Sequence, residues 1–294
     1  MPKKSQAAAT PKARSISGEI WHRFVRNKGA MVGAVIVLLL VLVAVFGNII
    51  IDYDTQVAGY NITERLQGPS LRHLFGTDEM GRDIFLRTMY GARYSLSIGV
   101  VATLMSMVIG IALGAIAGYF GKAVEETIMR ITDILSAVPG ILLAIIIVAS
   151  LGQSTLNLMI AMGVGGIPSF VRITRAAVLK VRGEEYIEAC RAIGLRTRTI
   201  IVTHILPNCL SPIIVQATLR VAGSIIGAAG LSFIGLGVPL PSPEWGALLS
   251  AGRGFMRDYP YMTFFPGLTI MITVLALNLL GDGLRDAFDP KLKR

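Results

Sequence analysis

The sequence has little charge and few of the side chains that carry chemistry. Only 16% of its 294 residues are Asp, Glu, Lys or Arg, and 53% are hydrophobic, which excludes an ordinary soluble domain. It contains neither a GxxxxGKS/T phosphate loop nor an HExxH metal motif. We therefore expect no catalytic residue, cofactor site or metal site in this chain, and any ATP hydrolysis must come from another one. The two cysteines, Cys190 and Cys209, both fall near the predicted cytoplasmic side, so we expect no disulfide.

Other absences narrow the class of protein further. The net charge of +10 is spread over short segments that flank apolar runs, as the positive-inside rule predicts, and this distribution excludes nucleic-acid binding. A secondary transporter working alone usually carries acids inside its spans, whereas here the only acid near a span is Asp133. A membrane-embedded hydrolase is a further alternative, but His204 has no His or carboxylate partner nearby in the sequence.

Long uncharged runs predict an all-α, polytopic membrane protein with six transmembrane helices. The run 134–171 would form a single helix about 57 Å long, nearly twice a ~30 Å hydrocarbon core, so it must be two spans that separate at 152–154. We expect Pro139 and Pro168 to kink these two helices. The predicted spans are 29–51, 95–121, about 128–151, about 155–179, 206–237 and 261–281.

An even number of spans places both chain ends on one side, and charge indicates which. Predicted inner segments hold 20 Lys or Arg against 10 acids, and outer segments hold 7 against 8, so both termini are predicted to be cytoplasmic. The resulting division is a basic cytoplasmic tail 1–28, a first helix 29–51, an external loop 52–94, a five-helix core 95–283 and a cytoplasmic tail 284–294.

Several segments carry more specific expectations. Within the first tail, the spacing of Ile16, Ile20 and Phe24 fits either a short interfacial helix or a disordered tail. Gly110 and Gly114 form a GxxxG pair suited to close packing within one bundle. The proline-rich segment 235–245 is predicted to be an ordered external loop with Trp245 at the depth of the membrane interface. The acids of 78–83 lack calcium-loop spacing and indicate a folded external loop.

A polar stripe interrupts the fifth span. Gln216, Arg220 and Ser224 recur every four residues, and Gly223 and Gly227 lie beside them. Since an arginine near the middle of a span costs ~2.5–3.5 kcal/mol on insertion scales, it must face water, protein or a counter-charge. We predict that Gln216, Arg220 and Ser224 line a pore and that Arg220 attracts anionic groups. The alternative is a structural arginine paired with an acid or with backbone carbonyls of a partner chain.

The cytoplasmic loop 181–207 is rich in charge and contains a short amphipathic helix. Its apolar surface comes from Tyr186, Ile187, Ala189, Cys190 and Ile193, and Gly194 follows where the helix would end. Because the chain's own spans do not need such a helix for burial, we expect it to dock onto another protein.

These residues resemble a known motif. Glu188-Ala189-Cys190, then Gly194, then Leu206-Pro207, are similar to the EAA loop of ATP-binding-cassette importer permeases, with Cys190 in place of an alanine and His204 in place of an isoleucine. Segments 21–33, 76–96, 231–250 and 281–293 resemble the dipeptide and oligopeptide branch of that family, which has relatives for glutathione and nickel.

The resemblance implies a type I importer permease core with an extra N-terminal helix, in the bacterial inner membrane. The implied partners are a second homologous permease, two cytoplasmic ATPase subunits that hold ATP and magnesium, an external solute-binding protein and the lipid bilayer. The implied cargo is a dipeptide or oligopeptide, with glutathione or a nickel complex as the alternative. The residues that would couple the chain to the ATPase are Glu185, Tyr186, Glu188, Ala189, Cys190, Ala192, Gly194, Leu206 and Pro207.

Overall fold

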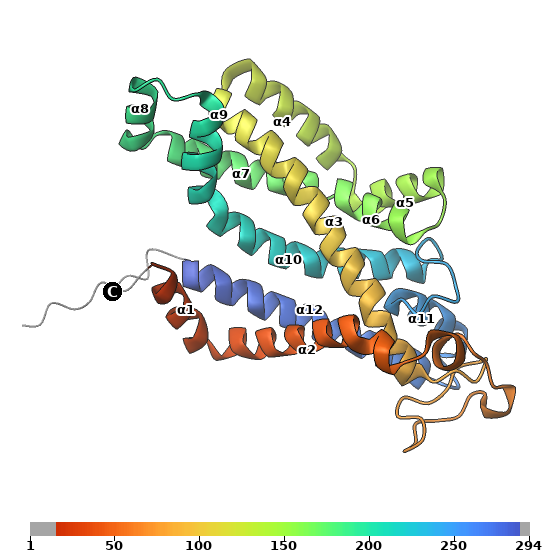
Figure 1. Cartoon of the computed structure of the whole chain (residues 1–294). Helices are drawn as coiled ribbons and strands as arrows, with labels where there is room; N and C mark the ends of the chain where they lie inside the picture. Colours follow the sequence, from red (N-terminus) through yellow and green to blue (C-terminus); the bar gives the residue numbers. More distant parts are fainter. Residues whose placement is uncertain (1–15, 289–294) are drawn as a thin grey trace, which may run out of the picture.

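A computed structural model describes residues 16–288, and this part of the chain is helical throughout apart from loops and one isolated β-bridge (Figure 1). The predicted all-α class is therefore confirmed. The elements are α1 (Ile16–Arg26), α2 (Lys28–Ile50), η1 (Tyr53–Val57), η2 (Ile62–Glu64), α3 (Ile84–Phe120), α4 (Lys122–Ala137), α5 (Gly140–Leu151), α6 (Thr155–Val164), α7 (Ile167–Arg182), α8 (Glu185–Ala192), α9 (Thr197–Thr199), η3 (Ile200–Ile205), α10 (Leu206–Phe233), α11 (Trp245–Gly252), η4 (Arg253–Phe255) and α12 (Tyr261–Phe288).

Within residues 16–288, five helices are long and apolar enough to cross a membrane, and the bent pair α4 and α5 would be a sixth span if it counts as one. The packing of the chain ends favours six. Phe24 of α1, Ala30 of α2 and Ala287 of α12 form one buried cluster, so the two described ends lie together at one end of the bundle. Figure 1 shows this end on the left, with α11 and the segment 51–83 on the right. An odd number of crossings would have left the ends apart.

The second span begins earlier than its hydropathy predicts. We expected loop from 52 to 94, but α3 starts at Ile84, where the Asp83 carboxylate caps the helix by accepting from Leu86 N at 2.9 Å. The first turns carry Arg87, which is fully buried: Nη1 donates to Val57 O at 2.7 Å and Nη2 to Pro241 O at 3.3 Å. Charge at Arg87 concealed the helix, because its burial depends on loops distant in sequence.

The proline-rich segment leads into a helix, and protein covers the side chain of Trp245. Trp245 is buried at the start of α11 and donates from Nε1 to Thr88 O at 2.9 Å. The preceding residue, Glu244, is 1% exposed and caps α11 by accepting from Gly246 N and Ala247 N at 3.0 and 2.9 Å. Because its indole N–H has a protein partner, Trp245 is part of the core at the end of the bundle that contains α11.

A row of three glycines lets α3 lie close against α7. A Cβ on Gly114 would stand 2.6 Å from Val171 O, and one on Gly118 would stand 2.9 Å from the Val178 side chain. Gly110 faces Phe170 in the same way. The predicted use of Gly110 and Gly114 for packing within one bundle is confirmed, and Gly118 extends it by a turn.

The two predicted kinks have different outcomes. At Pro139 the chain bends, and more sharply than a kinked helix would, because α4 and α5 meet at 86°. Two ion pairs hold α4 along α7: Arg172 Nη2 to Asp133 Oδ1 at 3.0 Å, and Arg175 with Glu125. The second break lies at Gly165–Gly166, between α6 and α7, so Pro168 begins a helix instead of kinking one.

The last two long helices also have other ends than predicted. The fifth span ends at Phe233 and not at residue 237. The sixth, α12, continues to Phe288, so the first part of the predicted tail 284–294 is helical. Residues 1–15 and 289–294 of the two predicted tails lie outside the described part of the chain. Within residues 16–26, the spacing of Ile16, Ile20 and Phe24 does form a helix, α1.

Candidate functional site

The loop 181–207 folds into a short helix, α8, which lies between the end of α7 and the segments α9 and η3 that lead into α10. Helix α8 ends as the sequence predicts, with Gly194 at φ +76°. Gly194 N donates to Arg191 O at 3.0 Å and Leu195 N donates to Cys190 O at 3.1 Å. These two bonds define a Schellman motif, which closes the carbonyl end of a helix through a left-handed residue. The Gly194 backbone therefore sets the direction in which the chain leaves α8.

One face of α8 packs against other helices of the same chain. Ile187 is 0% exposed and belongs to a cluster with Val178 of α7 and Ile205 of η3, and Cys190 packs against the same cluster. The guanidinium of Arg191 lies over the Tyr119 ring at 5.3 Å, which ties α8 to the end of α3. We predicted that the chain's own helices do not need α8; this is wrong for Ile187, which completes their core.

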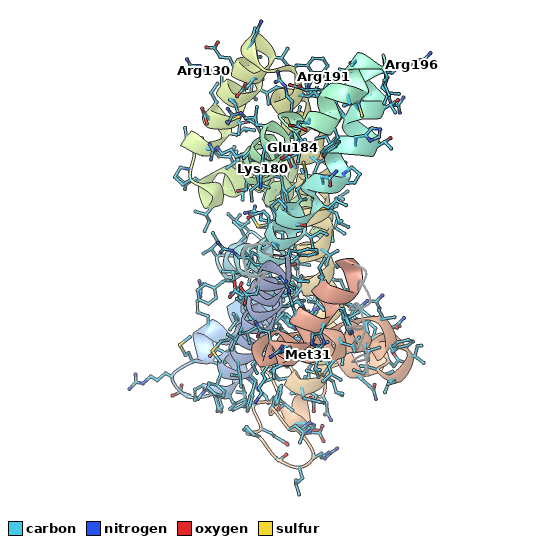
Figure 2. The ribbon with its side chains drawn as sticks, turned by 90° about the vertical axis from the view of Figure 1, so that its left-hand side faces the viewer. Met31, Arg130, Lys180, Glu184, Arg191 and Arg196 are labelled. Atoms are coloured by element: carbon cyan, nitrogen blue, oxygen red, sulfur yellow. The ribbon has the colours of Figure 1, made fainter. Side chains whose placement is uncertain are left out.

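The opposite face of α8 is open. Tyr186 is 44% exposed and Ile193 75% exposed, and Glu188, Ala189 and Ala192 are exposed as well. Glu185 and Glu188 stand in the first turn, where the helix dipole favours negative charge. Partial desolvation and the nearby Glu184 raise the pKa of the Tyr186 hydroxyl, so the phenol stays neutral and can donate. Figure 2 shows Arg191 and Arg196 at the extreme end of the molecule, together with Arg130 of α4.

The remaining residues of the motif lie where α10 begins. Leu206 is the first residue of α10 and packs against the cluster around Ile187, and Pro207 occupies the first turn, where a missing N–H costs nothing. The motif residues therefore lie in α8 and in the first turn of α10, and η3 connects these two segments.

The structure separates the predicted polar stripe of α10. Gln216 lines a groove of about 810 Å³, together with Lys180, Glu184 and Arg285. Figure 2 shows Lys180 and Glu184 below the tip formed by Arg191 and Arg196. Arg220 lines a different pocket, and Ser224 is 1% exposed within its own chain. The three residues therefore do not share one open surface, because Ser224 faces the interior of the bundle.

Arg220 donates a hydrogen bond to the backbone near the interruption between α6 and α7. Its Nη2 donates to Met162 O at 3.0 Å, near the last turn of α6, where carbonyls lack partners within the helix. Ser106, a residue that our sequence reading did not single out, places its hydroxyl 2.5 Å from Gly163 O. Irregular backbone inside a membrane needs such side-chain partners. The glycines at 163, 165 and 166 were the available sequence signal for this break.

The described residues 16–288 contain no group of three or more His, Cys, Asp or Glu side chains arranged to hold a metal ion. Asp78 and Asp83 have other partners: Asp78 pairs with Arg82 at 2.7 Å, and Asp83 Oδ2 lies 2.8 Å from His73 Nδ1. These contacts stabilise the loop between η2 and α3.

Comparison with known proteins defines the class. Residues 110–294 match the family described as binding-protein-dependent transport system inner membrane component, and residues 15–69 match the N-terminal transmembrane domain of oligopeptide transport permease C. The chain therefore belongs to the binding-protein-dependent inner-membrane permeases of ATP-binding-cassette importers, in the branch that carries the permease C type of N-terminal domain.

Particular relatives agree with this placement. The chain is 48% identical to a dipeptide transport system permease protein DppC of Alkalihalophilus pseudofirmus, over 94% of this chain and 90% of the relative. It is 46% identical to a glutathione transport system permease protein GsiD of Pectobacterium atrosepticum, over 94% and 91%. It is 44% identical to a di/tripeptide permease DppC of Pseudomonas aeruginosa, over 94% and 92%.

Solved structures give the same fold. A permease in an inward-facing structure of the MetNI methionine ABC transporter aligns with a TM-score of 0.58 at 20% identity. The alignment covers 98% of that chain but 70% of this one, so this protein carries structure beyond the shared core. Membership of the family places the chain in a bacterial inner membrane as a multi-pass permease.

Proposed function

We propose that this chain forms one half of the pore of an ATP-driven importer for dipeptides or oligopeptides. A second homologous permease supplies the other half, two cytoplasmic ATPase subunits bind ATP and magnesium, and an external solute-binding protein delivers the cargo. The similarity to dipeptide permeases over 94% of the chain supports this cargo. The comparable similarity to a glutathione permease keeps glutathione as the alternative, and a nickel complex is a further one.

The observation that carries the proposal is the two-sided character of α8. Its open face, with Tyr186, Glu188 and Ile193, offers apolar and acidic contacts to an ATPase groove. Its closed face fixes Ile187 between α7 and η3, which lead into two different spans. A displacement of α8 by the ATPase would therefore move α7 and α10 together, which is how nucleotide binding can shift a permease between inward- and outward-open states.

A reconstitution experiment tests this proposal. Purification of the tagged chain from its natural membrane should recover an ATPase and a second permease. Together with the solute-binding protein encoded beside this chain, the complex in liposomes should accumulate a radiolabelled dipeptide only when ATP is supplied on the cytoplasmic side. Accumulation by this chain alone, driven by a proton or sodium gradient, would instead support a stand-alone secondary transporter.

Orientation is a separate prediction. We expect reporter fusions at Gly68 and Ser242 to report an external location. Fusions at Arg196 and Lys291 should report a cytoplasmic location, because the segments rich in Lys and Arg are predicted to lie on the cytoplasmic side. Lys291 falls outside the described residues. Alkaline phosphatase and green fluorescent protein fusions give opposite signals and serve as mutual controls. An external signal at Arg196 would contradict both the orientation and the assignment of α8.

A further inference from the structure

Arg220 has a positive charge that its own chain does not balance. Within residues 16–288 no Asp or Glu oxygen forms an ion pair with its guanidinium, and the one hydrogen bond that it donates goes to Met162 O. Its Nε is buried without a hydrogen-bond partner. Arg220 as a whole is partly buried. A charge in a membrane helix is costly unless an opposite charge or water meets it, so an anion would stabilise the arginine at this position.

Arg220 lines a pocket of about 200 Å³ that lies between the start of α5, the end of α6 and α10. The lining residues come from the start of α5, the end of α6 and the middle of α10: Gly140, Ile141, Ala161, Met162, Gly165, Arg220, Gly223 and Gly227. A Cβ added at Gly140 or Gly223 would meet nothing within 4 Å. The absence of side chains at these positions therefore leaves room for a ligand beside Arg220.

The beginning of α5 strengthens the preference for a negative group. Residue 139 is a proline, so the helix starts with no side chain that caps it. The first N–H groups, at Gly140 and Ile141, precede the first helical hydrogen bond, which runs from Leu143 N to Pro139 O. A helix start carries partial positive charge, and here it borders the same pocket as the arginine.

We propose that this pocket binds the carboxylate of the transported peptide during passage, with Arg220 as the specificity-determining residue. A guanidinium can present two parallel N–H groups to a carboxylate, and the N–H groups of α5 can donate from the side. The inference rests on the proposed function, because it assumes that a peptide reaches the pocket. It adds to the proposed function the chemical group that the permease recognises, which is a free carboxylate on the cargo.

Protection of an introduced thiol tests the site without relying on cargo selection by the solute-binding protein. Gly223→Cys, in a background with Cys190→Ala and Cys209→Ala, places a small reporter in the pocket of the assembled complex. Its reaction with a water-soluble maleimide is read from the mass of this chain. We expect millimolar alanyl-alanine to slow the reaction several-fold, and the corresponding dipeptide amide, which lacks the carboxylate, to leave it unchanged.

Substitutions at Arg220 and Gln216 test whether the protection of the thiol by dipeptide depends on the charge of Arg220. Arg220→Gln keeps a donor for Met162 O but removes the charge, so the dipeptide concentration that gives half protection should rise on the order of tenfold or more. Arg220→Lys should keep part of the protection. Gln216→Ala, one turn earlier on α10 and lining the other groove, is the matched control and should behave as the parent does.

Each other outcome overturns the proposal in a distinct way. A thiol that never reacts, with or without ATP, means that water and cargo do not reach the pocket. Equal protection by the amide, or unchanged protection in Arg220→Gln, removes the carboxylate or the arginine from the site. Loss of the second permease from the Arg220→Gln complex, without any protection in the parent, assigns Arg220 to an ion pair with that chain. If the parent complex accumulates dipeptide with ATP in these cases, the proposed function stands and only this inference fails.

Discussion

Replacing Gly194 with valine is expected to remove most ATP-driven uptake while the permease still inserts normally. Gly194 has φ +76°, and its N–H closes the carbonyl end of α8. A β-branched residue resists this backbone conformation, with strain on the order of 1–3 kcal/mol. Strain of that size corresponds to roughly a 5- to 150-fold shift against the observed helix end. Since nothing lies within 4 Å of a Cβ at Gly194, the effect comes from the backbone and not from a clash.

Gly183 offers a matched control for Gly194→Val. It ends α7 in the same loop, but at φ −81° and ψ 0°, which any residue adopts, and a Cβ there would be in ordinary contact at 3.7 Å. Gly183→Val should therefore retain uptake. The measurements are ATP-dependent dipeptide uptake, the amount of chain in the membrane and recovery of the ATPase with the tagged permease. Uptake by Gly194→Val equal to that of the parent at equal abundance would refute a role for this turn in coupling.

Gly114→Val is expected to reduce the stability of the permease strongly. A Cβ at Gly114 would stand 2.6 Å from Val171 O and 2.7 Å from Thr174 Cβ, so α3 and α7 would have to separate. Overpacking of a tight contact typically costs about 1–3 kcal/mol and occasionally more. Relief by a side-chain rotation is not available here, because the nearest obstacle is backbone. We expect a clear decrease in the Tm of the purified permease and early proteolysis at the separated helices.

The control for Gly114→Val is Gly47→Val in α2. Gly47 is also a glycine inside an apolar span, but a Cβ there would meet nothing within 4 Å. Both substitutions carry the same cost in intrinsic helix propensity, so the difference between them isolates the contact between α3 and α7. Equal Tm values for the two variants would show that α3 and α7 do not need this close approach.

The sequence alone determined the class of protein and which segments form its long helices, although not where those helices begin and end. Uncharged runs of sufficient length can be stable only as membrane helices, since a lipid environment satisfies no backbone hydrogen bond. The turn at Gly194 and the close packing at Gly110 and Gly114 were also predictable, because each depends on a local property of glycine. The family resemblance of the loop 181–207 followed from residue spacing, which needs no tertiary information.

Tertiary contacts decided the features that hydropathy could not. Arg87 is charged, yet it lies inside α3, because carbonyls of distant loops accept from its two Nη atoms and the Asp78 carboxylate lies 3.8 Å from its Nε. The 86° turn at Pro139 accompanies two ion pairs between α4 and α7 that join residues 39 and 50 positions apart.

The stripe on α10 separated for the same reason. Spacing by four places Gln216, Arg220 and Ser224 on one side of a helix, but the neighbours of that side change along its length. A groove lies beside Gln216, a broken span beside Arg220 and the bundle interior around Ser224. Periodicity determines which residues share a face of a helix, whereas only the packing of the other helices determines what each part of that face meets.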